Sequence, residues 1–490
     1  MPPQSRLQNQ TYQTHFNYFN SQIYVFGYSY IIYNFAVYST CNLNHIIMKR
    51  VLSIILSLCM CAPILPLHAQ QHPNRRGDNK LKYVIGTEVN ISDSVNAYKL
   101  LYENIPQDKD FLNDPIFAIV GRHGYFYFSV GANLKLGLCY DWGNPNDNPQ
   151  GISVADMQKA APGDSHAFQM TAQSSNIYFN IIGFPNSANR AGLFFSLALD
   201  GEPGNSYKVH ADNVYLRWRD FTLGYTSSLY NDMSADPYTV DGHGPIASGG
   251  HNNILINYQK YVNRHIRLGI GLEGPTRDFS TYLPDNISEE VFSGNLRQRV
   301  PDIPLYINYS FNSSDHIRLS AIGRVLTYRN YVKNCNQNAF GWGLKLTGAA
   351  TFGKSVVYGM VQGGKGISSY IQENRNLGLD LVPDMKRPGH LKEPLSWGCI
   401  LGLQYNWRPN LFSTVVYSFM RNYMDPFSNA STGIAYADQL RYGQYALCNV
   451  IWRLNRLMQF GVEYLYAQKN TFGSERLSNN RLSLQACVSF

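Results

Sequence analysis

The feature that most constrains this chain is a long, unbroken alternation of apolar and polar residues. Between Tyr125 and Asp141, every second residue from Phe126 to Tyr140 is apolar. The residues between them form the other parity, which is mostly small or polar and includes Lys135. Successive side chains of a β-strand point to opposite faces, so the segment is expected to be a strand with one apolar face. Its 17 residues exceed the length of about 5–6 residues that is usual for a strand. A tilted membrane strand of roughly 9–11 residues with an overhang fits better.

The same period of two recurs along the chain and predicts sixteen strands. They are expected at 122–141, 174–184, 190–201, 206–219, 220–230, 252–262, 264–275, 303–312, 314–328, 338–352, 354–364, 394–408, 410–421, 439–453, 456–467 and 476–490. An even number of strands closes an antiparallel barrel without a free edge. The expected fold is therefore all-β, a sixteen-stranded antiparallel transmembrane β-barrel of the outer-membrane porin type over residues 122–490. Charged residues such as Arg267 and Glu463 must then face the lumen, because a charge facing lipid is costly.

The connections between these strands alternate in length from residue 206 onward. Very short turns are expected at 219–220, 263, 313, 353, 409 and 454–455. Long loops are expected at 231–251, 276–302, 329–337, 365–393, 422–438 and 468–475. Outer-membrane barrels combine short periplasmic turns with longer extracellular loops, so this order favours a barrel over a soluble β-sandwich.

Composition agrees with a barrel and excludes several other classes. The mean hydropathy of −0.27, with 36 Tyr, 25 Phe and 40 Gly, suits a chain in which only every second strand residue meets lipid. The net charge of +8 is too mild and too dispersed to indicate a nucleic-acid partner. The eight cysteines form no C-x-x-C pair, and no phosphate-binding or dinucleotide motif occurs. Neither a metal nor a cofactor is expected.

The N-terminal region divides into three parts. Residues 48–69 are expected to be a signal peptide, with Lys49 and Arg50 before an apolar core and a cleavage site near Ala69. Residues 1–47 are interpreted as a spurious upstream extension, disordered in the protein. Residues 70–121 are expected to be a periplasmic N-terminal segment, either a leader or a small oligomerisation element, in which 95–103 suits a short helix.

The last strand carries a second targeting feature. Leu482, Leu484 and Val488 share one face with the C-terminal residue Phe490. A final strand that ends in an aromatic residue resembles the signal read by the barrel-assembly machinery. Together with the signal peptide, it predicts the bacterial outer membrane as the location and outer-membrane lipid as a partner.

The region 214–274 resembles the DcaP-like porin family. The resemblance rests on Asn213–Thr226 (NVYLRWRDFTLGYT), on the Asp-rich loop from Asp232 to Asp241, and on the strands 254–258 and 267–271. Members of this family are trimeric sixteen-stranded channels for small anions, notably dicarboxylates. The resemblance therefore implies a homotrimer and small anionic solutes as partners. The Tyr- and Asn-rich strands suggest a Bacteroidetes-type source. Family members often begin with a coiled-coil stalk, but no heptad repeat is apparent here.

Two sets of residues are candidates for the pore. In sixteen-stranded porins the loop after the fifth strand folds inward, which would make 231–251 a constriction loop; the alternative is an ordinary surface loop. Its expected pore-facing residues are Asp232, Asp236, Asp241 and His243. Strand parity places further cations inside the barrel, and rings of Arg and Lys favour anions. The expected pore-lining residues are Arg217, Arg318, Arg324, Lys345 and Lys135, the first three as a basic ladder opposite the acidic loop, unless they lie at the periplasmic rim.

The function indicated is a porin for passive diffusion of small hydrophilic solutes with a preference for anions. The alternative is a non-conducting barrel that acts through its surface loops as a structural or interaction protein. An enzyme is not expected, because His210, His243 and His251 have no obvious nucleophile paired with them. Single-channel conductance distinguishes the first two readings.

Overall fold

The computed structural model describes most of the chain after residue 90. The described residues are 83–85, 91–106, 117–121, 124–201, 207–249, 252–281, 297–312, 314–427 and 434–490. They belong to one compact unit. The expected extension 1–47 and the expected signal peptide 48–69 lie outside the described residues.

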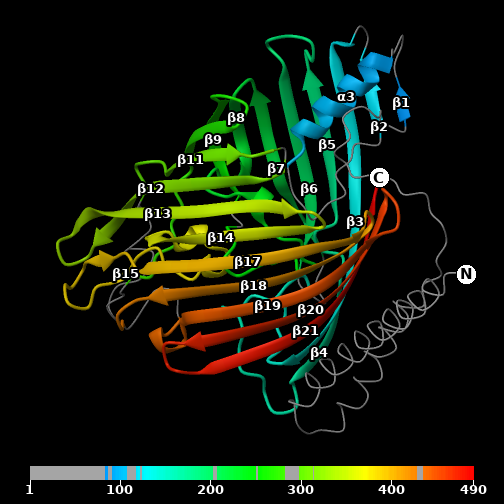
Figure 1. The fold of residues 1–490 in the computed structure, drawn as a ribbon. Helices are drawn as coiled ribbons and strands as arrows, with labels where there is room; N and C mark the ends of the chain where they lie inside the picture. The colour runs from blue at the N-terminus through cyan, green and yellow to red at the C-terminus, as the bar shows by residue number, and fades with distance from the viewer. Residues whose placement is uncertain are drawn as a thin grey trace, which may run out of the picture. The chain divides into compact units, whose positions relative to one another are not determined.

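Sixteen antiparallel strands form a closed barrel (Figure 1). The sheet holds 19 strand segments; two of them, β1 and β2, belong to the N-terminal segment, and β4 and β5 are halves of one strand because both pair with β3. The barrel strands are β3 (Phe126–Gly143), β4 (His166–Thr171), β5 (Asn176–Gly183), β6 (Ala191–Asp200), β7 (Lys208–Trp218), β8 (Phe221–Ser227), β9 (Asn252–Tyr261), β10 (Ile266–Glu273), β11 (Ile303–Ser310), β12 (His316–Asn330), β13 (Cys335–Phe352), β14 (Ser355–Lys365), β17 (Leu395–Arg408), β18 (Leu411–Tyr423), β19 (Leu440–Arg453), β20 (Met458–Thr471) and β21 (Arg476–Ser489).

The remaining elements are short and lie before the barrel or in its connections. Within the described residues they are β1 (Tyr83–Ile85), α3 (Ile91–Asn104), β2 (Phe117–Val120), β15 (Val382–Pro383), β16 (Leu391–Lys392) and the 3-10 turns at Met233–Ala235, Ser368–Tyr370, Gln372–Asn374 and Tyr436–Asp438. Among the described residues, no helix is both long and apolar enough to cross a membrane.

The barrel closes between its first and last strands. β21 pairs with β3 in antiparallel register from Asn479 opposite Gly143 to Ser489 opposite Asn133. The backbone of Phe490 continues this ladder by exchanging two hydrogen bonds with Ala132. Closure joins the first strand to the last, and a sheet in lipid requires this because its backbone groups find no water there. The expected sixteen-stranded antiparallel barrel is thereby confirmed.

The two faces of each strand differ as the alternation predicts. On β13, Leu344 and Leu346 are each 51% exposed on the outer face, whereas the intervening Lys345 is 2% exposed on the inner face. On β12, Ile317 and Leu319 face outward in the same way. An apolar outer band of this kind matches the hydrocarbon core of a bilayer, so the charged parity lies inside.

Some connections differ from the expected order of short and long. Hairpin pairing continues to Asn330 opposite Cys335 and to Asn470 opposite Arg476. The loops expected at 329–337 and 468–475 are therefore tight turns, because these strands extend beyond the expected ends. In contrast, β8 is shorter than the strand expected at 220–230: it ends at Ser227, and the chain from residue 228 leaves the sheet.

The described part of the N-terminal segment is joined to the barrel sheet. β2 pairs with the beginning of β3, and β1 pairs in parallel with β2. Helix α3 packs Ala97, Leu100 and Leu101 against Tyr127 and Ile182, which lie on the inner face of β3 and β5. A segment of the expected periplasmic region thus lies against the inner wall.

Candidate functional site: the barrel lumen

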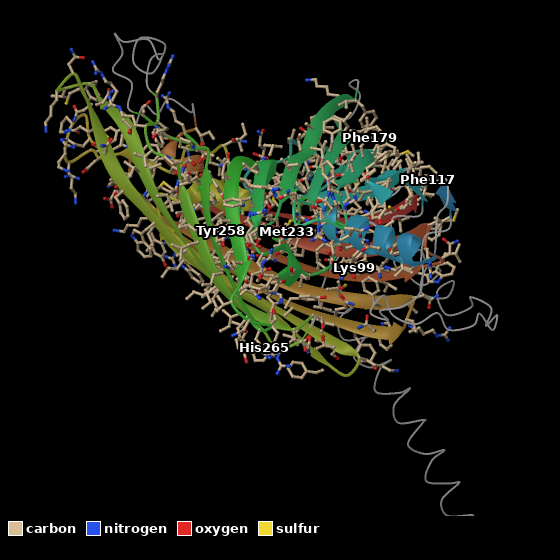
Figure 2. All side chains as sticks on the ribbon, turned by 90° about the horizontal axis from the view of Figure 1, so that it is seen from above. Lys99, Phe117, Phe179, Met233, Tyr258 and His265 are labelled. Atoms are coloured by element: carbon tan, nitrogen blue, oxygen red, sulfur yellow. The ribbon has the colours of Figure 1, made fainter. Side chains whose placement is uncertain are left out.

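The connection between β8 and β9 crosses the interior of the barrel. The backbone amides of Val240 and Asp241 donate to the Glu463 carboxylate on β20, at 2.7 and 2.9 Å. The amide of Gln362 on β14 donates to the carbonyl of Ala247 at 2.6 Å. A segment that leaves β8 and bonds to β14 and β20 must span the lumen, and Figure 2 shows Met233 within the ring of strands.

Two acids of this connection are anchored to the wall. Asp232 meets His316 at 2.9 Å and Thr347 at 2.5 Å. Burial alone would raise the pKa of Asp232, but the His316 hydrogen bond and the charge of Arg318 hold it well below its ordinary value. Asp241 accepts a 2.6 Å hydrogen bond from the Tyr445 hydroxyl. Burial raises the pKa of Asp241 above its ordinary value. Both carboxylates therefore fix the path of the loop instead of projecting into open water.

The other two expected loop residues are less enclosed. Asp236 is half-buried. His243 lies 3.3 Å from the Glu373 carboxylate and also lines the cavity described below. Burial alone would lower the pKa of His243, but Glu373 and Asp241 raise it. The imidazole is thus held between two acids at the edge of the open space.

Two further connections fold inward beside this one: the segment between β3 and β4 and the segment between β14 and β17. Glu373, in the segment between β14 and β17, accepts hydrogen bonds from the Ser153 hydroxyl at 3.0 Å and the Ala155 amide at 2.5 Å. Ile152 and Ile246 pack with Ile371 and with wall residues of β17 to β20 in one apolar cluster. Three inward loops therefore fill the side of the lumen next to β14 and β17–β20.

Three of the expected pore-lining cations are buried. The side chain of Arg324 is 0% exposed and meets Asp302 and Asp380 at 3.0 Å each. Lys345 is 2% exposed and donates to Asn231 at 3.1 Å, and Lys135 is 6% exposed. All three lie on the inner parity, but a buried cation does not face permeating solute.

Arg217 and Arg318 do not join Arg324 in one basic ladder. Arg318 stacks over the Tyr306 ring at 3.8 Å, hydrogen bonds to the Leu229 carbonyl and lies 4.0 Å from Asp232. Arg217 instead donates to the carbonyl of Glu103 on α3 at 2.6 Å. Strand alternation correctly predicted that each arginine lies on the inner face. The group that binds each arginine comes from a different loop or helix.

A polar cavity of about 740 Å³ remains on the other side of the lumen. Its wall residues come from β7, β8 and β9, and its remaining sides come from the inward loops and from Pro106, which follows α3. The Asp, His and Arg side chains at this cavity are His210, Asp212, His243, Arg277, Asp278 and Arg375. Arg277 and Arg375 are exposed, and neither belongs to a strand. Strand alternation assigns an inner or outer face only to strand residues, so no signal in the sequence could have identified Arg277 and Arg375 as cavity residues.

Asp278 is an acid of this cavity whose charge depends on pH near neutrality. Burial and the nearby Asp380 carboxylate raise the pKa of Asp278 to about 7, although the Gly378 amide donates to it at 2.7 Å. Near neutral pH this carboxyl therefore changes charge at the cavity wall. Within the described residues, no group of three or more His, Cys, Asp or Glu side chains could hold a metal ion.

A closed sixteen-stranded barrel with an apolar outer band and inward loops is the porin type of outer-membrane protein. The structure is similar to the outer-membrane channel DcaP of Acinetobacter baumannii, with a TM-score of 0.62 and 17% identity over 75% of this chain and 99% of that chain. It also matches an anion-selective porin from Comamonas acidovorans (TM-score 0.47, 10% identity, 74% and 100% of the two chains). No protein-family model and no curated protein sequence matches the chain. The expected DcaP-like fold is thus supported by structure at low sequence identity.

Proposed function

We propose that the protein is an outer-membrane channel for passive diffusion of small hydrophilic solutes, with a preference for anions such as dicarboxylates. The observation that carries this proposal is the polar cavity of about 740 Å³ inside the closed barrel. Channels of this kind need a polar, water-accessible interior within an apolar shell. The DcaP likeness supports the same reading at the level of the fold.

The preference for anions rests on Arg277 and Arg375. Both are exposed side chains at the cavity, and arginine binds carboxylates through two parallel hydrogen bonds. Of the two acids there, Asp278 has a pKa raised by burial to about 7, so its negative charge is only partial near neutral pH. Arg324, Lys345 and Lys135 are buried, and Arg217 and Arg318 are held by other groups, so this proposal places the selectivity on Arg277 and Arg375.

The test is electrical recording of the purified protein in planar bilayers. Across a KCl gradient, the native chain should conduct with a zero-current potential on the anion-selective side. Arg277→Gln and Arg375→Gln should each move that potential toward zero. Arg408→Gln is the matched control, since Arg408 is an exposed arginine at the β17–β18 turn. Clear cation selectivity of the native chain would contradict the anion preference, and liposome swelling would rank dicarboxylates against sugars.

A second candidate is a barrel that does not conduct and acts through its loops. The apolar cluster of Ile152, Ile246 and Ile371 favours it, because this cluster closes one side of the lumen with packed side chains. Single-channel recording separates the two: a sealed barrel gives no current steps at any voltage.

The proposed assembly is a homotrimer. It follows from the resemblance of the region 214–274 to DcaP-like porins, whose members are trimers. Native mass spectrometry of the detergent-solubilised protein tests it, and a single species of monomer mass would contradict it.

A further inference from the structure

Helix α3 rests on a patch of the inner wall that breaks the usual rule for barrel interiors. Inward-facing residues of β3, β5, β6 and β7 are apolar here, although such positions are ordinarily polar in a water-filled barrel. These residues, which we call the docking patch, are Tyr127, Tyr178, Ile182, Phe194 and Tyr215, all less than 5% exposed. An apolar patch inside a water-filled lumen is stable only if another part of the protein covers it.

One face of α3 provides that cover. Ala97, Leu100 and Leu101 are 0–4% exposed and pack on Tyr127 and Ile182. Ile105, directly after the helix, packs on Tyr178, Phe194 and Tyr215. The spacing of these helix residues places them on one side, as expected for an amphipathic helix. The patch and the helix face are therefore complementary parts of one apolar core.

The barrel wall also caps the C-terminal end of α3. The last four carbonyls of a helix have no partner within it. Here Asn180 donates to the Leu101 carbonyl at 2.8 Å, Arg217 to that of Glu103 at 2.6 Å, and the Tyr215 hydroxyl to that of Asn104 at 2.5 Å. A cation at this end is also favoured by the helix dipole. Such bonds specify one position for the helix end.

The opposite face of α3 is exposed although the helix lies against the inner wall. The side chains of Lys99 and Glu103 are 69% and 50% exposed and lie 4.0 Å apart, and Tyr102 is 38% exposed. Figure 2 shows Lys99 within the ring of strands. The helix is beside the short 184–190 turn, the periplasmic side of the barrel, and Pro106 beyond its end lines the cavity.

We propose that α3 is a fixed lining of the periplasmic half of the pore, and that Lys99, Tyr102 and Glu103 are specificity-determining residues in contact with permeating solute. The proposal rests on the proposed channel function and adds a selectivity element that strand parity does not supply. A permeating ion leaving the cavity then passes one cation and one anion on the helix.

Charge reversal on the exposed face tests this proposal without disturbing the docking patch. In planar bilayers, Lys99→Glu should move the zero-current potential toward cation selectivity, and Glu103→Lys should move it the opposite way. Lys260→Glu is the matched control, because Lys260 is an exposed lysine on the outward parity of β9. Its potential should equal that of the native chain.

Modification of a thiol supplies an independent readout of position. Lys99→Cys should lose conductance when a bulky methanethiosulfonate is added from the periplasmic side, whereas the native chain and Lys260→Cys should not. Native-like current that responds neither to charge reversal nor to the reagent would overturn the role of α3 alone. Absence of current in the native chain and in every variant would instead contradict the proposed function.

Discussion

At the scale of single residues, Asp278 shows how tertiary surroundings set the charge of a pore. In the folded protein its pKa is raised from the ordinary value of 3.8 to about 7, because burial and Asp380 disfavour the ionised form. The folded protein therefore holds a proton that the unfolded chain releases, so this group lowers the free energy of unfolding as pH rises from about 4 to 7. Above pH 7 the wall of the cavity carries an added negative charge.

Anion selectivity should consequently be greater at pH 6 than at pH 8. The zero-current potential of the native chain should shift in the cation direction over this interval, and Asp278→Asn should hold it at the low-pH value. Asp315→Asn is the control: burial alone would raise the pKa of Asp315, but hydrogen bonds from Asn312 and Thr351 together hold it below the ordinary value. A pH step that persists in Asp278→Asn would rule out this carboxyl as its source.

Arg324 is expected to act on stability and not on selectivity. Removing a buried cation leaves Asp302 and Asp380 as uncompensated buried acids, which typically costs about 3–5 kcal/mol. Arg324→Met should therefore lower the temperature at which the barrel unfolds, measured by electrophoresis as the change from folded to unfolded migration after heating. Arg408→Met, at an exposed arginine, should not lower it. If Arg324 lined open water, the opposite pattern would appear: unchanged thermal stability and a shifted zero-current potential.

At the scale of elements, the connection 228–249 is the clearest departure from a surface loop. It is held across the lumen by Glu463, Gln362 and Tyr445. Replacing residues 233–247 by a short Gly-Ser linker should increase single-channel conductance, because the segment occupies space that ions would otherwise use.

The exposed turn 331–334 offers a matched control for that deletion. Replacing it by the same linker should leave the conductance at the native value, since its residues 332–334 are exposed at the end of the β12–β13 hairpin. Equal conductance of the native chain and the 233–247 variant would show that this segment does not restrict the pore.

At the scale of the whole molecule, assembly and folded stability should depend on Phe490 differently. Its ring is 63% exposed, while its backbone closes the barrel against Ala132. Phe490→Ala should reduce the amount of barrel inserted into the outer membrane but leave the thermal stability and conductance of the inserted fraction unchanged. Phe460→Ala, at an outward aromatic of β20, should insert normally. Normal insertion of Phe490→Ala would mean that the terminal ring is not an assembly signal.

The predictable part of this protein is its barrel. The alternation of Phe126 to Tyr140 with Lys135 and its neighbours identified strand, length and face, and the same pattern identified sixteen strands. Errors appeared at strand ends, as at 329–337, where hairpin pairing continues past the expected end of the strand. Parity also placed Arg217, Arg318 and Arg324 on the inner wall.

The site could not be predicted in the same way, because its parts are distant in sequence. Nothing near Arg324 indicates that Asp380 will bury it, and nothing near Arg375 indicates a cavity. The apolar residues Tyr178, Phe194 and Tyr215 did offer a signal, since they interrupt the polar inner parity where α3 docks.

The sequence by itself determined the strands, their two faces and the closed barrel, because side-chain alternation is a local property of an extended chain. Only the tertiary structure decided which loops and which helix enter the lumen, and so which charges meet solute. The physical reason is that these paths depend on buried contacts between segments far apart in the chain, such as Asp241 with Tyr445 and Glu103 with Arg217.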